Sequence, residues 1–310
     1  MGPGGRMTLG IVIAVIGALS FAAASVLQAL GAERVAQRAE HRDELRSTTP
    51  HPTLRSTAAT MLTVPFLVGF VFDIVGFVAT IVSARLIPLF LSQTIISARM
   101  VATAVLAAIV LKVSLTWREW VSGAVVIMSL VLLAISAGRE GNDYDAWMSW
   151  AVLVAGPLLI VIGIAGARVL KRRIAAFAGL IAGAIFGVMA VASRVLTGVS
   201  PLDLGVLFTD PALYALLISG IGGFYLFTVA LQTGSVNGAA AALVVGQTVL
   251  PGAVGIIFLG DVTRSGWGPA AIVAFVAAVV GGVILASSGA VTAVEKAESV
   301  NLPAGYGHGG

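Results

Sequence analysis

The stretch PLFLSQTIISARMVATAVLAAIVLK, residues 88–112, decides the fold class of this chain. Its apolar character extends over the roughly 20 residues that a helix needs to cross a bilayer. A helix is expected, because backbone polar groups in hydrocarbon must be satisfied within the segment. Gln93 and Arg99 nevertheless lie inside the stretch. A lone charge near the middle of a membrane costs at least about 2.5–3.5 kcal/mol, so we expect Arg99 to have a partner or water.

The whole chain shares the apolar character of this stretch. Of its 310 residues, 58% are hydrophobic and 10% are charged, with a mean hydropathy of +1.04, whereas a soluble domain carries about 25% charged residues. We therefore predict an all-α, polytopic membrane protein. The absence of cysteine excludes disulfides and thiolate chemistry. No catalytic or metal-ligating constellation is apparent, so we predict no enzyme activity, no cofactor, no metal site and no nucleic-acid partner.

About nine segments have the length and composition of transmembrane helices. They are residues 8–32, 58–83, 87–111, 119–138, 147–168, 174–198, 211–232, 236–259 and 268–289. The polar residues 33–57 are expected to extend the first helix until Pro50 and Pro52 end it. The Gly-rich tail, residues 290–310, is expected to be disordered.

The positive charges are divided unequally between the two sides of such a bundle. Four Lys and Arg residues fall on the side of the N-terminus and twelve on the other side. The positive-inside rule therefore predicts a plasma-membrane protein with its N-terminus outside and its C-terminus in the cytoplasm. Six acidic residues then fall on the outside, where we expect ordinary exposed loop positions: Glu140, Asp143, Asp145, Asp203, Asp210 and Asp261.

Two similar stretches indicate an internal repeat. Residues 91–96 are LSQTII and residues 245–250 are VGQTVL, and each lies in the third helix of a block of four. We predict a first repeat (1–138), a linking fifth helix (139–173), a second repeat (174–289) and a tail (290–310). A shift of five crossings inverts the second block in the membrane, an arrangement in which transporters place their substrate site near the midplane.

Three longer stretches carry a family resemblance. They are residues 72–136, beginning FDIVGFVATIVSARLIPLFLSQTIISARM, residues 224–267, beginning FYLFTVALQTGSVNGAAAALVVGQTVLPG, and residues 17–34, GALSFAAASVLQALGAER. Their hydrophobic patterns and few polar residues resemble the drug/metabolite transporter superfamily, in particular its NIPA-like, EamA-like nine-helix branch of actinobacterial membrane proteins. The resemblance implies an inverted-repeat helical bundle that moves small solutes.

Asp73 and Arg99 are the strongest candidates for a coupled pair. Asp73 is expected to be the only carboxylate inside a span, and it lies 13 residues before the turn near residue 86, while Arg99 lies 13 residues after it. Both are then roughly 20 Å from the turn, at matching depth. The pair either lines a central cavity and responds to substrate or protons, or only locks the second and third helices together.

The repeat supplies further candidates for substrate contact. Gln93–Thr94 and Gln247–Thr248 are related by the repeat and would meet at the midplane, where such side chains bind solutes or join helices. Pro251 follows the second pair and would interrupt its helix. Weaker candidates are Gln28, Arg194, Gln232 and Asn237, and for Arg194 snorkelling towards headgroups is a sufficient explanation.

Three functions are compatible with these features. The first is a secondary transporter or exporter of a small organic solute or lipid-linked metabolite. The second, suggested by the NIPA-like resemblance, is a magnesium transporter, although one Asp facing an Arg is a poor divalent-cation site. The third is a non-transporting scaffold for an envelope-biosynthesis partner. The partners expected are membrane lipids and a small-molecule or ion substrate, and the sequence also allows a homodimer.

Overall fold

The structure, a computed structural model, confirms an all-helical chain of membrane-spanning type. It describes residues 3–43, 63–110, 112, 114–141, 145–169, 174–199, 203–233, 236–289, 291–292 and 294. Within these ranges, nine helices are long and apolar enough to cross a membrane. The first of them extends beyond the predicted span, because α1 runs from Pro3 to Asp43. The expected end of this helix at Pro50 and Pro52 lies outside the described residues, as does the tail from residue 295. Contrary to the expected disorder from residue 290, residues 291, 292 and 294 are helical, and Val291 and Val294 are buried.

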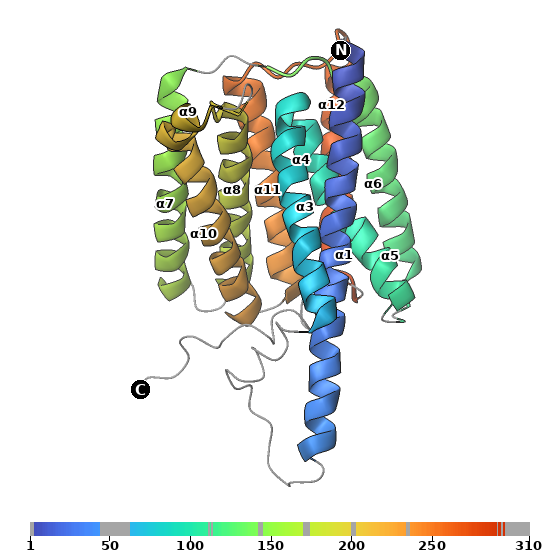
Figure 1. Cartoon of the computed structure of the whole chain (residues 1–310). Coiled ribbons are helices and arrows are strands. Elements are labelled where there is room, and N and C mark those ends of the chain that lie inside the picture. Colours follow the sequence, from blue (N-terminus) through green and yellow to red (C-terminus); the bar gives the residue numbers. More distant parts are fainter. Residues whose placement is uncertain are drawn as a thin grey trace.

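The helices stand side by side in one bundle (Figure 1). Their bounds are α1 (Pro3–Asp43), α3 (Val64–Leu86), α4 (Leu89–Ser97), α5 (Arg99–Val110), α6 (Trp117–Ser136), α7 (Ala146–Val169), α8 (Ile174–Val195), α10 (Pro211–Thr233), α11 (Val236–Phe258) and α12 (Gly268–Ala286). A short helix, α9 (Leu204–Thr209), lies between α8 and α10. Helix α1 begins at the top of Figure 1. We call the end at the top of Figure 1 the N-terminal side.

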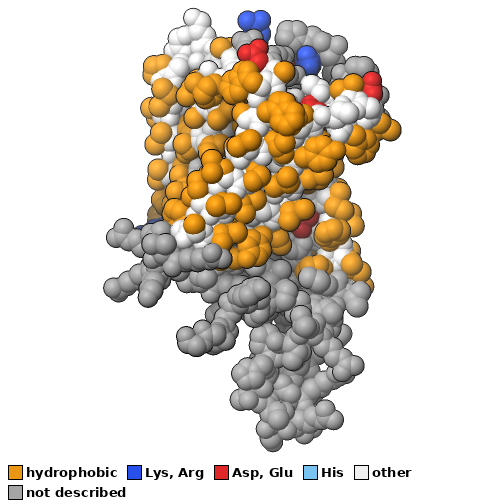
Figure 2. Space-filling view, turned by 90° about the vertical axis from the view of Figure 1, so that its left-hand side faces the viewer, with side chains coloured by type: hydrophobic (Ala, Val, Ile, Leu, Met, Phe, Trp, Pro, Cys, Tyr) orange, Lys and Arg blue, Asp and Glu red, His pale blue; other side chains and the backbone are white. Residues whose placement is uncertain are grey.

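The outer surface of the bundle is apolar. Large side chains such as Ile221, Met128 and Val273 are 74%, 68% and 65% exposed. Figure 2, which views the side of α7 and α10, shows hydrophobic side chains over the height of the helices, charged ones at the top and a recessed acidic side chain further down on the right. A soluble monomer does not expose so much contiguous apolar surface, so this surface faces lipid.

The helices of the two predicted blocks pack in equivalent pairs. Helix α1 packs on α3, and α8 packs likewise on α10. Helix α1 also contacts α4 and α5, as α8 contacts α11. Helices α6 and α12 pair, and α4 pairs with α11, so these two contacts join the blocks. An inverted repeat would produce this pattern, and the repeat itself stays a prediction.

Glycines bring the backbones of α8 and α11 into direct contact. A Cβ atom on Gly183 would lie 2.3 Å from the carbonyl oxygen of Leu243, and one on Gly246 would lie 2.3 Å from that of Leu180. Small residues allow such close approach between membrane helices. This contact fixes the height of Gln247 in the bundle, because Gln247 follows Gly246 directly.

The third span is divided in two, which the sequence did not predict. At Ala98 the backbone N–H is shared between the carbonyls of Thr94 and Ile95, at 3.0 and 3.1 Å, and ψ is −3°. The Thr94 hydroxyl donates back to the carbonyl of Phe90. Such back-bonding bends helices, and no Pro or Gly marks the position. The division places Arg99 at the first residue of α5.

Asp73 is not the only carboxylate within a span, contrary to expectation. Glu119 lies in the first turn of α6 and is 8% exposed. It forms a capping box with Thr116 and accepts a hydrogen bond from the Gly289 N–H at 3.1 Å. A carboxylate in the first turn satisfies helix N–H groups and the helix dipole, so Glu119 has a structural role.

Candidate functional site

Asp73 and Arg99 lie in one cluster between α1, α3 and α5. Gln28 donates a hydrogen bond to Asp73 Oδ2 at 2.5 Å, and Arg99 attracts the same carboxylate electrostatically. The Arg99 guanidinium carbon lies 5.3 Å from the centroid of the Phe21 ring, within cation–π range. We call Gln28, Asp73, Arg99 and Phe21 the Asp73 cluster.

Helix α1 mediates this cluster. The Phe21 ring also packs on Gly76, where a Cβ atom would lie 2.9 Å from its nearest carbons. Phe21 therefore lies between α3 and Arg99, and Gln28 adds a second link from α1 to Asp73. The sequence predicted two charges at matching depth. It did not predict that an aromatic ring and an amide of the first helix would join them.

A second cluster joins α4 to α11 near half-depth of the membrane. The Ser97 hydroxyl accepts a hydrogen bond from Gln247 Nε2 at 3.0 Å and lies 2.7 Å from the Thr248 hydroxyl. Thr248 in turn donates to the carbonyl of Val244 at 2.6 Å. Because the proton of Thr248 is committed to Val244, the proton of Ser97 serves Thr248. We call Ser97, Gln247 and Thr248 the central cluster.

The central cluster borders a small cavity between α4, α6, α11 and α12. Its volume is about 10 Å³, close to the space that one water molecule needs. Its polar lining comes from both blocks, with Thr94 and Ser97 on one side and Thr248 on the other, and Ala98 at the helix division completes the wall. The structure thus brings together Thr94, Gln247 and Thr248 as the sequence predicted, and adds Ser97.

Gln93 lies one residue before Thr94 and is 4% exposed. Its Nε2 atom has no hydrogen-bond acceptor among the described residues. A buried amide without a partner is costly, of the order of 1–3 kcal/mol. Gln93 does not line the cavity, and a polar group brought by a ligand next to it would satisfy its amide.

Pro251 lies inside α11, one turn after Gln247, and contrary to expectation the helix continues through it without a break. It has no N–H, so the Gln247 carbonyl loses its helical donor. Pro251 itself packs against α8, where a Cβ atom on Gly187 would lie 2.8 Å from its ring. Gln232 and Asn237 lie in α10 and α11, but their side chains are outside the described part of the chain.

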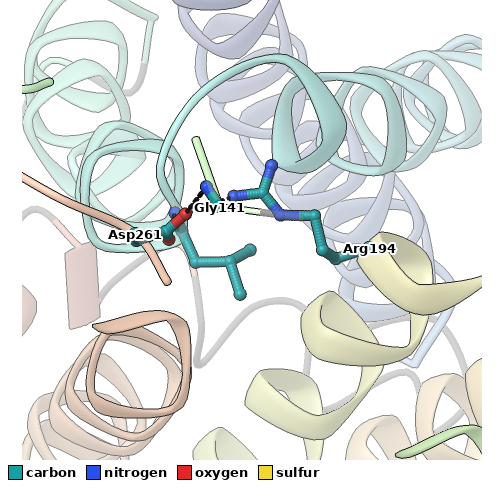
Figure 3. Close-up of polar contacts among 4 residues, drawn as sticks. Gly141, Arg194 and Asp261 are labelled. Carbon is teal, nitrogen blue, oxygen red and sulfur yellow. Dashed lines mark hydrogen bonds and ion pairs between the residues drawn. The ribbon is translucent and has the colours of Figure 1, made fainter. Parts of the chain in front are cut away.

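A third cluster, on the N-terminal side, was not predicted. Asp261 Oδ1 accepts hydrogen bonds from Arg194 Nη2 at 2.7 Å and from the Gly141 N–H at 2.8 Å. Asp261 Oδ2 accepts a hydrogen bond from the Leu89 N–H, the first residue of α4, at 2.6 Å. Figure 3 shows the Arg194 guanidinium and the Gly141 nitrogen converging on one side of the carboxylate. We call these four residues the Asp261 cluster.

This arrangement corrects two predictions. Arg194 does not snorkel, because its side chain is 1% exposed and paired with Asp261. Asp261 is not an exposed loop residue, because its side chain is 0% exposed. The depth of Arg194 at the end of an apolar helix was visible in the sequence. A partner 67 residues away was not, because only tertiary packing brings the two together.

Asp210 is also buried, contrary to expectation. It precedes α10 and accepts hydrogen bonds from the Thr197 N–H and hydroxyl, at 2.7 and 2.5 Å, and from the Ala212 N–H at 2.8 Å. Burial raises the pKa of Asp210, but these hydrogen bonds outweigh burial and hold its pKa below the ordinary value. Asp210 thus caps a helix and joins the loop after α8 to it.

None of the protein-family models, characterised proteins or solved structures with which the chain was compared matches it. The resemblance to the drug/metabolite transporters stays an expectation from the sequence. Among the described residues, no group of three His, Cys, Asp or Glu side chains is placed to hold a metal ion.

Proposed function

We propose that the protein is a secondary transporter that moves a small organic solute or lipid-linked metabolite by alternating access. The observation that carries the proposal is the central cluster and its cavity. Polar side chains of both four-helix blocks meet there, at half-depth of a bundle whose outer surface is apolar. Transporters of inverted-repeat type place their substrate site at such a position, formed by interrupted helices.

Three further features support the proposal. The third span is divided beside the cavity, and Pro251 interrupts the hydrogen bonding of α11 on the opposite wall. Gln93 presents a buried amide that a substrate oxygen would satisfy. The Asp73 cluster contains a carboxylate, Asp73, and a cation, Arg99, within the membrane, where such residues often couple transport to protons or ions. Membership of the drug/metabolite transporter superfamily, the inverted repeat, a plasma-membrane location and an outward N-terminus belong to the same proposal.

The proposal is tested by an untargeted comparison of metabolites and lipids. A deletion strain is complemented with the wild type, with Ser97→Ala or with Ser219→Ala. Ser97→Ala removes the hydroxyl that joins the two blocks. Ser219→Ala is the matched control, because this buried hydroxyl lies in α10 outside the site and has no hydrogen-bond partner among the described residues.

We expect the deletion to change the level of a small solute or lipid-linked metabolite across the envelope. Wild type and Ser219→Ala restore that level, whereas Ser97→Ala, expressed in equal amount, does not. If the deletion changes no metabolite or lipid but alters the magnesium content of the cells, measured on the same cultures, the magnesium alternative is supported. If Ser97→Ala restores the changed metabolite or lipid as fully as the wild type does, a transport site at the central cluster is contradicted. This outcome favours the scaffold alternative.

A further inference from the structure

The loops on the N-terminal side are joined across the two blocks by backbone hydrogen bonds. The Gly138 N–H donates to the Val262 carbonyl at 3.0 Å, and the Arg264 N–H donates to the Ser136 carbonyl at 2.9 Å. Between these bonds, Ala137 and Thr263 face each other as an antiparallel pair. This two-stranded contact lies between the ends of α6 and α11 and the beginning of α12.

The Asp261 cluster closes the same end from within. One carboxylate holds the start of α4, the loop at Gly141 and the end of α8. Helix α4 also carries Ser97 of the central cluster, eight residues further along. A movement of α4 at the membrane centre therefore bears directly on the Leu89–Asp261 hydrogen bond.

The backbones at this closure are in direct contact. A Cβ atom on Gly141 would lie 1.7 Å from the Leu259 carbonyl oxygen, and one on Gly138 would lie 2.7 Å from the Val262 carbonyl oxygen. No side chain fits between the loops at these two positions, and Asp261 and Arg194 are buried beneath them. Within the described residues, the loops of the two blocks are thus closed against each other at these two positions, a contact that we call the seal.

The seal nevertheless has incomplete hydrogen bonding. Arg194 Nε and Nη1 are buried and have no acceptor among the described residues. Asp261 already accepts three hydrogen bonds, so it does not compensate the whole guanidinium. Buried donors without acceptors make the closed arrangement less favourable, which brings an open arrangement closer in free energy.

We infer that the Asp261 cluster and the 136–139/262–264 backbone contact form a gate on the N-terminal side of the central cavity. The inference rests on the proposed transport function and adds which side is closed here and which bonds must break for the other state. Opening separates Asp261 and Arg194 of the second block from Leu89 and Gly141. The cavity then becomes accessible to water from the N-terminal side.

The gate is tested by cysteine accessibility, because the chain contains no cysteine of its own. Ala278→Cys places a thiol in the cavity wall, ten residues into α12. Asp203→Cys, exposed before α9, marks the N-terminal side. A membrane-impermeant maleimide is applied to sealed vesicles of the orientation in which Asp203→Cys reacts.

The Ala278→Cys protein then receives one of two further substitutions, and each is expected to open the gate by a different means. Gly141→Ala drives the loops apart and leaves the charges of Arg194 and Asp261 in place. Asp261→Asn weakens the hydrogen bonds and the ion pair of the Asp261 cluster. Gly205→Ala is the matched control for Gly141→Ala, because the nearest atom to its Cβ would be Asp203 Oδ1, in a side chain, at 3.3 Å. Asp145→Asn is the matched control for Asp261→Asn, because Asp145 is an exposed acid of the same side.

We expect slow labelling of Ala278→Cys alone and with either control, and labelling at least about tenfold faster with Gly141→Ala. Such an increase corresponds to a shift of about 1.4 kcal/mol towards the open state. Asp261→Asn acts in the same direction. Unchanged labelling in Gly141→Ala protein that retains its elution profile and melting midpoint overturns the gate.

A reversible lock separates the gate from the transport proposal. Ala137 and Thr263 form a non-hydrogen-bonded antiparallel pair, whose Cα atoms are typically about 4.5 Å apart, within the range of a disulfide. The Ala137→Cys/Thr263→Cys protein is oxidised in the complemented strain and then reduced. We expect the metabolite defect after oxidation and its correction after reduction.

If the cross-linked protein corrects the defect as well as wild type does, the gate is wrong and transport stands. If the deletion itself changes no metabolite or lipid, the transport proposal fails. The labelling of Ala278→Cys then still decides whether this side of the bundle opens.

Discussion

Replacing Gly183 by Ala tests the contact that positions the central cluster. The new Cβ atom would lie 2.3 Å from the Leu243 carbonyl oxygen and 2.9 Å from the Gln247 nitrogen. An ordinary contact begins at 3.4 Å, so α8 and α11 must separate by about 1.1 Å. Overpacking of this kind costs about 1–3 kcal/mol, whereas Ala for Gly within a helix gains roughly 0.5–1 kcal/mol.

Gly123→Ala is the matched control, because its Cβ atom would meet only Val101, at an ordinary 3.5 Å. It receives the helix gain without the overpacking. The melting midpoint in detergent, followed by tryptophan fluorescence, is therefore expected to fall for Gly183→Ala and to stay or rise for Gly123→Ala. Gly183→Ala also displaces Gln247 from Ser97 and should impair complementation. Equal melting midpoints for the two variants would refute the backbone contact.

Three further substitutions test the other clusters. Arg194→Ala leaves the Asp261 carboxylate buried without its counter-charge, so the melting midpoint should fall by the equivalent of about 3–5 kcal/mol. Asp261→Ala also removes the acceptor of the Leu89 and Gly141 N–H groups, so the double variant should lose less than the sum of the two single losses, and strictly additive losses contradict the pairing. Asp210→Asn should cost about 1–3 kcal/mol at pH 7, because both carboxylate oxygens accept hydrogen bonds and the amide nitrogen that replaces one of them cannot. The pKa of Asp210 is lower in the folded protein than in the unfolded chain. The stabilisation that the Asp210 carboxylate gives is therefore present above about pH 4 and is lost as the pH falls through the folded pKa. Asp210→Asn should lack this part of the loss of stability measured between pH 7 and about pH 3. Asp73→Asn keeps an oxygen that accepts from Gln28 but removes the counter-charge of Arg99, so the melting midpoint should fall, by less than for Arg194→Ala because Asp73 is only partly buried. The folded variant should lose transport in the complementation assay, and full complementation leaves the Asp73 cluster only a structural role.

The stretch 88–112 shows how far pattern reasoning reached. Its length and composition predicted a spanning helix, and the structure confirms a span from Leu89 to Val110. The interruption at Ala98 escaped prediction because it lies beside the back-bonding hydroxyl of Thr94 and is marked by no Pro or Gly. The nearby Gln-Thr pairs were matched by their similarity, and the contact between α4 and α11 places their threonines on one cavity.

The acidic residues show where the same reasoning failed. Asp210, Asp261 and Glu119 were expected to be ordinary loop positions or were overlooked, and all three are buried with several hydrogen bonds. A carboxylate near a helix end is compatible with exposure, capping or ion pairing. Sequence position alone does not distinguish these, because the donors come from segments up to 172 residues away, as in the hydrogen bond from Leu89 to Asp261.

The sequence by itself determined the solvent of this protein and the number of its spans. Burial of apolar side chains in lipid and the need to satisfy every backbone group are local properties, which hydropathy and length express directly. Only the tertiary structure decided which polar groups meet. Helix rotation and helix crossing decide which of these groups are neighbours, and both are set by close contacts between glycines and large side chains. They determine the pairing of Arg194 with Asp261, the cavity between Thr94 and Thr248, and the contact of Phe21 with Arg99.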